Sequence, residues 1–224
     1  MKKIVLKVFV VGLLLLFGAS AGFAEDMRAT VAAAPAGEMD HAAMKGMDPS
    51  TMTEEQKAMQ ARMQEYTTPN ANHEVLKSFV GSWKANVKMW MDPKATPEES
   101  EGTSEAKMIM GGRFLEQTFN GTFMGGPFEG RGIYGYDNMR QEYTGLWFDS
   151  MATGIMVSAA KHNAETKVMT EEGSMSCPIS GEGHRWYKAV TTIIDADHYT
   201  YESFLKDKDG QEFRSMLISY SRAQ

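Results

Sequence analysis

The sequence predicts an all-β fold, an antiparallel barrel of about ten strands with short helices before it. Three observations support this prediction. Apolar residues recur with a period of two from Gly81 to Arg222, which is the period of a strand buried on one face. Gly, Pro, Asp and Asn separate these runs at even spacing, as in a meander that closes into a barrel or sandwich. No helical pattern lies between the runs, which argues against a parallel α/β sheet.

The composition of the 224-residue chain excludes several classes of protein. Its single cysteine rules out an internal disulfide framework and a zinc site built from cysteines. The formal net charge of −6 argues against nucleic-acid binding, which needs a basic surface. Apolar residues at 42 % and aromatic residues at 10 % are enough for a core, so the chain is expected to be globular.

Residues 1–24 have the order of a secretory signal peptide. Three lysines precede an apolar run from Val8 to Phe17, and small residues follow. The apolar run is about half of the roughly 20 residues that a membrane span needs, and no later segment is a candidate span. We therefore expect cleavage after Ala24, with Ala21 as the alternative, and a periplasmic or secreted protein without a membrane span.

The region before the strands divides into an arm and a short helical segment. Residues 25–47 contain few large apolar side chains other than Met, which predicts a flexible arm. Residues 48–80 begin with helix-start chemistry at Asp48-Pro49-Ser50. The first predicted helix there has one apolar face, formed by Met52, Met59, Met63 and Tyr66. A second short helix is predicted from Asn72 to the stop at Gly81.

Residues 81–224 are predicted to be one β-barrel domain. The first run shows the alternation most clearly, because Trp83, Ala85, Val87 and Met89 are apolar and the residues between them are polar. Similar runs give the remaining expected strands at 103–110, 115–123, 128–136, 141–149, 153–160, 166–172, 185–195, 198–206 and 212–222.

Several motifs in this domain resemble those of known barrels. Gly81-Ser82-Trp83 is similar to the G-x-W signature that opens the first strand of lipocalins and their calycin-like relatives. Tyr220-Ser221-Arg222 closes the last predicted strand. The resemblance implies that Arg222 packs over Trp83 as a structural clamp.

A longer string of motifs runs through the predicted domain. It consists of His73, Leu76, Gly81, Trp83, Met89-Trp90-Met91-Asp92-Pro93, Glu101-Gly102, Met110-Gly111-Gly112-Arg113-Phe114-Leu115, Pro127-Phe128-Glu129-Gly130, Gly135-Tyr136-Asp137-Asn138, Trp147, Asp149-Ser150 and Thr153-Gly154. This string resembles a lipocalin-like bacterial family catalogued as domain of unknown function 1579. The resemblance covers roughly residues 47–222 and implies no activity and no catalytic residues.

The sequence offers no recognisable catalytic motif, so a non-enzymatic protein is expected. The five histidines have no H-x-x-x-H or H-E-x-x-H spacing, and no serine lies in a G-x-S-x-G setting. The glycine-rich strings lack the pattern of a phosphate-binding loop. Cys177 precedes Pro178 in a predicted turn, and only His184 is a conceivable base for it.

The barrel interior is the first candidate site. A barrel of eight to ten strands has room for side chains or for one small ligand, so the alternatives are a packed core and a lumen that carries a small apolar or amphipathic molecule. Haem-binding calycin relatives use a His ligand, for which His162, His184 and His198 are all open. The strand alternation gives as lumen candidates Val87, Met89, Leu115, Phe119, Trp147, Trp186, Tyr199 and Tyr201.

The arm is the second candidate site. It carries Met-Asp-His-x-x-Met-x-x-Met, which places Met39, His41, Met44 and Met47 at short spacing. Thioethers are soft ligands that select Cu(I) or Ag(I), and imidazole adds a further donor. A copper or silver buffer is therefore the alternative function. No other cofactor is expected, and the sequence leaves the oligomeric state open.

Overall fold

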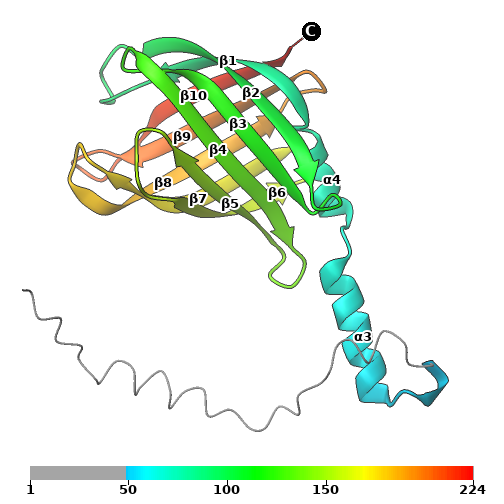
Figure 1. The fold of residues 1–224 in the computed structure, drawn as a ribbon. Coiled ribbons are helices and arrows are strands. Elements are labelled where there is room, and N and C mark those ends of the chain that lie inside the picture. Colours follow the sequence, from blue (N-terminus) through cyan, green and yellow to red (C-terminus); the bar gives the residue numbers. More distant parts are fainter. Residues whose placement is uncertain (1–48, 224) are drawn as a thin grey trace, which may run out of the picture. The chain divides into compact units, whose positions relative to one another are not determined.

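The computed structural model describes residues 49–223, and the strands of this part of the chain form one closed barrel (Figure 1). Each strand pairs antiparallel with its neighbours along the chain, and the first strand pairs with the last. The strands are β1 (Gly81–Met89), β2 (Glu98–Ile109), β3 (Phe114–Phe123), β4 (Gly126–Asp137), β5 (Glu142–Asp149), β6 (Met156–Asn163), β7 (Val168–Cys177), β8 (Glu182–Ile193), β9 (His198–Lys206) and β10 (Glu212–Arg222). The predicted antiparallel barrel of about ten strands is confirmed.

The strand boundaries differ from the prediction mainly at β2 and β7. β2 begins at Glu98 rather than at residue 103, because its acidic start pairs with β1 as far as Met89. β7 runs on to Cys177, through a register shift between Met175 and Cys177. The β2 extension is polar and has no apolar alternation, so its pairing with β1 decides that boundary.

The chain divides into two units, residues 1–53 and 54–224. The described part of the first unit includes a 3-10 turn, η1 (Pro49–Thr51). The second unit begins with α3 (Glu54–Thr67), which agrees with the predicted first helix. Its predicted apolar face is packed only in part. Met52, which precedes the helix, is buried and Met59 is half-buried, but none of the 14 residues of α3 is buried and Met63 and Tyr66 are clearly exposed.

The second helix, α4 (Ala71–Lys77), lies at one end of the barrel (Figure 1). Asn70 caps it through a capping box, since its side chain accepts from the Asn72 amide and the Asn70 amide donates to His73 Nδ1 at 3.0 Å. Leu76 and Phe79 are buried against the barrel core. One end of the barrel is therefore closed by α4 and the residues that follow it.

Arg222 lies over Trp83 at this closed end, with its guanidinium carbon 4.2 Å from the ring centroid. The Trp83 indole is only 1 % exposed, and its Nε1 donates to the Phe79 carbonyl at 2.8 Å. The Arg222 guanidinium also donates to the carbonyls of Val80 and Ala196. Strand β1, strand β10 and the chain after α4 are thus tied together by one pair of side chains.

The same contact explains the glycine of the G-x-W motif. Gly81 has a φ of +125°, and a Cβ at this position would lie 2.5 Å from Arg222 Nη1. A larger residue would be strained in its backbone and would displace the guanidinium.

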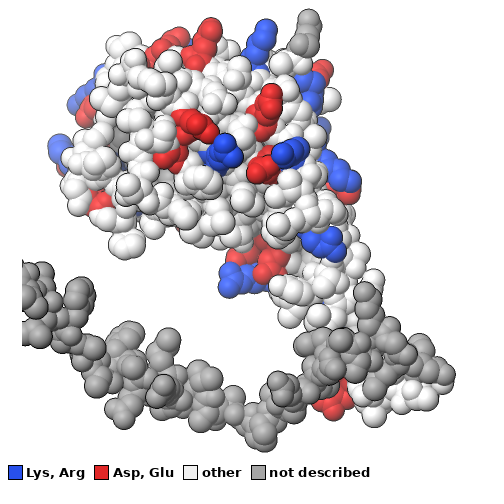
Figure 2. All heavy atoms as spheres, in the orientation of Figure 1, with Lys and Arg blue, Asp and Glu red and all other residues white. Residues whose placement is uncertain are grey.

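The outer face of the barrel carries charges of both signs, which lie side by side in Figure 2. Examples are the pairs Lys88–Glu99 at 2.9 Å and Lys107–Glu116 at 3.1 Å. Such exposed pairs are each worth about 1 kcal/mol or less. Within residues 49–223, no helix has the length and apolar character needed to cross a membrane.

Candidate functional site in the barrel lumen

The strand register defines which side chains face the lumen, the space that the ten strands enclose. Residues directly opposite each other on paired strands point to the same side. Starting from buried Trp83, the pairing runs through Ser104 and Phe119 to Gly130 and Asp149. The same alternation places Tyr187 of β8 and Tyr201 of β9 inside.

Several glycines lie on the inner wall, and aromatic rings lie against most of them. A Cβ at Gly102 would lie 2.6 Å from the Phe119 ring, and one at Gly132 would lie 2.5 Å from the Tyr134 ring. Rings lie against four further inward glycines, with Phe119 near Gly121, Trp147 near Gly130, Tyr134 near Gly145 and Tyr187 near Gly173. Because the rings occupy space that a Cβ would otherwise fill, they take up less of the centre of the barrel.

Several inward side chains retain accessible surface, although they lie deep in the molecule. Tyr134, Trp147, Glu171 and Tyr201 all face the lumen and are only half-buried. Protein surrounds Tyr134 and Tyr201, and this burial raises the pKa of both phenols well above the ordinary value. A side chain that is enclosed yet accessible lies beside a hollow, so the lumen is not a completely packed core.

A carboxylate and a group of phenols form the polar part of this hollow. The Tyr187 hydroxyl donates to Glu171 Oε1 at 2.8 Å. Burial, and then the charge of Glu171, raise the pKa values of Tyr134, Tyr187 and Tyr201. These phenols are therefore neutral in any physiological medium and keep their hydroxyl protons, and the Tyr187 proton is already donated to Glu171.

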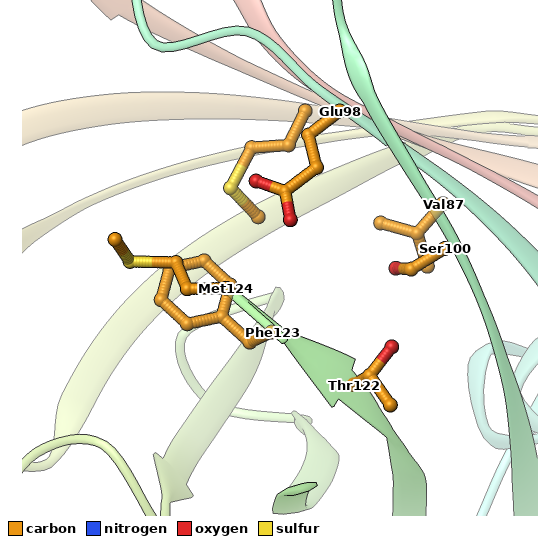
Figure 3. Close-up of a pocket in the computed structure, with 7 residues that line it drawn as sticks. Val87, Glu98, Ser100, Thr122, Phe123 and Met124 are labelled. Atoms are coloured by element: carbon orange, nitrogen blue, oxygen red, sulfur yellow. The ribbon is translucent and has the colours of Figure 1, made fainter. Parts of the chain in front are cut away.

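A small hollow lies at the barrel end opposite α4, between strands β1, β2 and β3. It has a volume of about 10 Å³, with room for about one water molecule. In Figure 3 the Glu98 carboxylate lies beside this hollow, and Phe123 and Met124 lie opposite. Its lining consists of Val87, Met89, Glu98, Ser100, Thr122, Phe123 and Met124.

Seven of the eight lumen candidates from the sequence face inward. Met89, Trp147 and Tyr201 border accessible space. Four others are buried in the core, namely Val87, Leu115, Phe119 and Tyr199.

Trp186 is the exception, and its predicted place inside the lumen is wrong. It pairs with outward Ser174, and its ring lies under the Lys206 ammonium at 4.5 Å on the outer surface. Tyr187 takes the inward position next to it and is 2 % exposed. Trp186 and Tyr187 are adjacent and both aromatic, so only one of them faces inward in the strand. The sequence pattern is equally consistent with either residue at the inward position.

Sequence reasoning also missed Glu171, Tyr134 and Tyr187. Glu171 is followed by Glu172, and one of these two acidic residues must face inward when the strand forms. The only available signal was the apolar alternation of Met169 and Met175, which places Glu171 on their face.

The three histidines considered as haem ligands lie in different environments. His184 and His198 are exposed, and His198 Nδ1 lies 2.9 Å from the Asp195 carboxylate. His162 faces inward on β6, next to Tyr143. Burial lowers the pKa of His162, and its Nε2 has no hydrogen-bond partner among the described residues.

The candidate copper ligands Met39, His41, Met44 and Met47 lie outside the described residues. Within residues 49–223, no group of three or more His, Cys, Asp or Glu side chains is placed to hold a metal ion.

Cys177 lies at the end of β7, in the turn toward β8, where its side chain is buried. Burial acts to raise the pKa of the thiol, but hydrogen bonds from Ser180, Arg185 and Ile179 together outweigh it and lower the pKa to about 7. Arg185 Nη1 lies 3.2 Å from the sulfur. The thiolate is therefore the form that this turn stabilises.

We expect the alkylation rate of Cys177 by iodoacetamide to rise through a midpoint near pH 7, rather than near the usual value of about 8.5. Arg185→Gln should move the midpoint upward, because it removes one donor to the sulfur. A wild-type midpoint near 8.5, measured by mass spectrometry of the adduct, would contradict the assignment.

A groove of about 350 Å³ lies outside the barrel, between the end of α3 and strands β3 to β5. Arg113 crosses this region and donates to the Thr67 carbonyl at 2.7 Å. Phe114 and Leu146 contribute exposed apolar surface to it. The sequence did not predict this groove, because its residues come from segments that meet only in the folded chain.

The fold and its inner surface define a closed antiparallel barrel with a partly hollow, aromatic lumen. The chain matches the model of a family described as protein of unknown function (DUF1579) over residues 68–222. It belongs to this family, as the motifs of the first strands predicted.

Solved structures include two similar barrels. Protein Rv2717c from M. tuberculosis is 16 % identical with a TM-score of 0.50, over 70 % of this chain and 100 % of that chain. A de novo designed fluorescence-activating β-barrel is 17 % identical with a TM-score of 0.37, over 66 % of this chain and 97 % of that chain. The mycobacterial structure shows a shared fold and nothing about activity. No curated protein matches the chain.

Proposed function

We propose that this protein is an exported, non-enzymatic barrel that binds or carries a small, largely apolar molecule in its lumen. One observation carries the proposal: Tyr134, Trp147 and Tyr201 face the inside of the barrel and still border accessible space. A ligand that filled this space would bury its apolar surface against flat aromatic rings. The surrounding hydroxyls would orient its polar groups.

The inner glycines support the same proposal. A packed core gains stability from large side chains that meet at its centre. Here the strand positions at Gly130, Gly132, Gly145 and Gly173 have no side chain, and the neighbouring rings lie against them. This arrangement preserves an internal surface that is already in place before a ligand arrives, which lowers the cost of ordering on binding.

The test uses a lumen-filling variant and a fluorescent apolar probe, N-pentyl dansylamide. Met156 faces inward, opposite Trp147, and is half-buried, whereas its neighbour Val157 is 53 % exposed on the outer face. We expect Met156→Trp to weaken probe binding at least about tenfold, because the larger ring occupies the hollow. Val157→Trp is the matched control and should leave probe binding unchanged.

Native mass spectrometry of the protein from its export compartment gives an independent reading. A retained organic mass that persists after deletion of residues 25–47 would support lumen binding. In the probe experiment, equal affinities of the Met156→Trp and Val157→Trp variants for the probe would contradict lumen binding. A stoichiometric Cu(I) adduct that is lost with residues 25–47, with no probe binding, would favour the metal-buffer alternative.

A further inference from the structure

We propose that the lumen selects an organic cation, an apolar body that carries a protonated amine, and that Glu171 binds the ammonium group. This inference rests on the proposed lumen binding and names the ligand class. It follows from the position of one carboxylate, from the neighbouring cations and from the aromatic groups around it.

Three acidic side chains share the inner face, and Glu171 is the one that lies in the middle of its strand, because Glu98 begins β2 and Asp149 ends β5. Asp149 accepts from Trp147 Nε1 at 3.0 Å and from the Met151 amide at 2.9 Å. Glu98 is exposed at the barrel end opposite α4. Glu171 accepts one hydrogen bond, from the Tyr187 hydroxyl to Oε1, and is half-buried. Its carboxylate therefore borders the accessible space inside the barrel.

No positive side chain of residues 49–223 forms an ion pair with Glu171. Two arginines stand at inward positions of the register, and both are engaged elsewhere. Arg185 donates to Cys177 Sγ and to the Lys206 carbonyl. Arg222 is held over Trp83 at the closed end. The centre of the lumen therefore carries a negative charge without a counter-charge from the described chain.

This arrangement distinguishes ligands by their charge. A neutral apolar ligand would strip water from Glu171 and leave the carboxylate without a partner, which is costly. The negative charge of Glu171 would also repel an anionic ligand. An ammonium group replaces the lost water with a charge-assisted hydrogen bond to the carboxylate.

The aromatic surroundings favour the same ligand class. Tyr134, Tyr187 and Tyr201 lie close enough to Glu171 for its charge to act on their hydroxyls. Neutral phenol rings attract cations through their faces. The apolar body of the ligand would lie against Trp147 and Met169, which share the partly accessible inner surface.

The experiment compares three dansyl amides of similar size, with an aminopentyl, a pentyl or a carboxypentyl tail. At pH 7 we expect the aminopentyl compound to bind at least about tenfold more tightly than the pentyl compound, and the carboxypentyl compound to bind most weakly. Glu171→Gln should remove the preference for the amine. Glu172→Gln, an outward and exposed neighbour, should retain it.

Tyr187→Phe provides a second variant that retains the carboxylate, and it should keep the preference for the amine. Thermal unfolding of each variant establishes that it is folded. Equal or tighter binding of the neutral or anionic compound by the wild-type protein would overturn the cation proposal and leave lumen binding standing. Absence of binding by all three compounds would overturn both proposals.

Discussion

Replacing Trp83 by Ala is expected to lower the free energy of unfolding by about 3–5 kcal/mol, the usual range for a buried tryptophan. Trp83 is 1 % exposed and lies against Tyr199, with ring centroids 4.8 Å apart. The substitution would leave a cavity where β1 meets β10, and it would remove the surface on which Arg222 rests. Denaturant unfolding measures the loss directly.

The other half of the clamp should have a smaller effect. Arg222→Ala removes the contact with the indole and the hydrogen bonds to the Val80 and Ala196 carbonyls. We expect it to cost about 1–2 kcal/mol. Neither substitution should alter ligand specificity, because both residues lie at the closed end of the barrel.

Trp186 supplies a matched control for this prediction. It also forms a cation–π pair, with Lys206, but the pair lies on the outer surface. Trp186→Ala should therefore cost about 1 kcal/mol or less. If Trp83→Ala left the unfolding midpoint unchanged, or if both tryptophan variants lost the same stability, the pair of Trp83 and Arg222 would not be a structural clamp.

Gly102→Ala is expected to lower the free energy of unfolding by about 1–3 kcal/mol, although it adds a single methyl group. A Cβ at this position would lie 2.6 Å from Phe119 Cζ and 2.8 Å from the Asn120 carbonyl oxygen. The ring can rotate away from a methyl group, but the carbonyl belongs to the β2–β3 pairing and cannot move without disturbing it. The strain therefore persists in the folded state.

Gly183 in β8 is the control for Gly102, because a Cβ at this position would have no atom within 4 Å. Gly183→Ala should be neutral or should stabilise the protein by up to about 1 kcal/mol, since alanine restricts the unfolded chain. Thermal and denaturant unfolding of both variants test the pair. If the Gly102→Ala protein were as stable as the Gly183→Ala protein, the prediction would be contradicted. The residues around Gly102 would then accommodate the added methyl group without strain.

The sequence predicted the barrel because local pattern and tertiary burial agree along most strands. In β1, polar residues alternate strictly with Trp83, Ala85, Val87 and Met89, and all four face inward. Only one side of such a strand can be buried, so its orientation follows from the pattern.

The pattern was insufficient where neighbouring residues have similar character. Trp186 and Tyr187 are adjacent aromatics, and Glu171 and Glu172 are adjacent acids. The partners across the strands decide which member of each pair faces the lumen. The Met face of α3 is packed only in part for a different reason: helical periodicity gives an amphipathic surface, but it does not supply a partner for that surface.

Closure of the barrel also has a consequence for how the chain folds. Nine strand pairings join consecutive segments and can form as local hairpins, whereas the pairing of β1 with β10 joins the two ends of the domain. Bringing these ends together carries the largest loss of chain entropy, because the loop between them contains the rest of the barrel. The contact between Trp83 and Arg222 lies on the pairing of β1 with β10. It therefore stabilises the one strand pairing that closes the barrel, whereas all the other pairings join consecutive strands. Its loss should speed the opening of the native barrel more than it slows the formation of the hairpins.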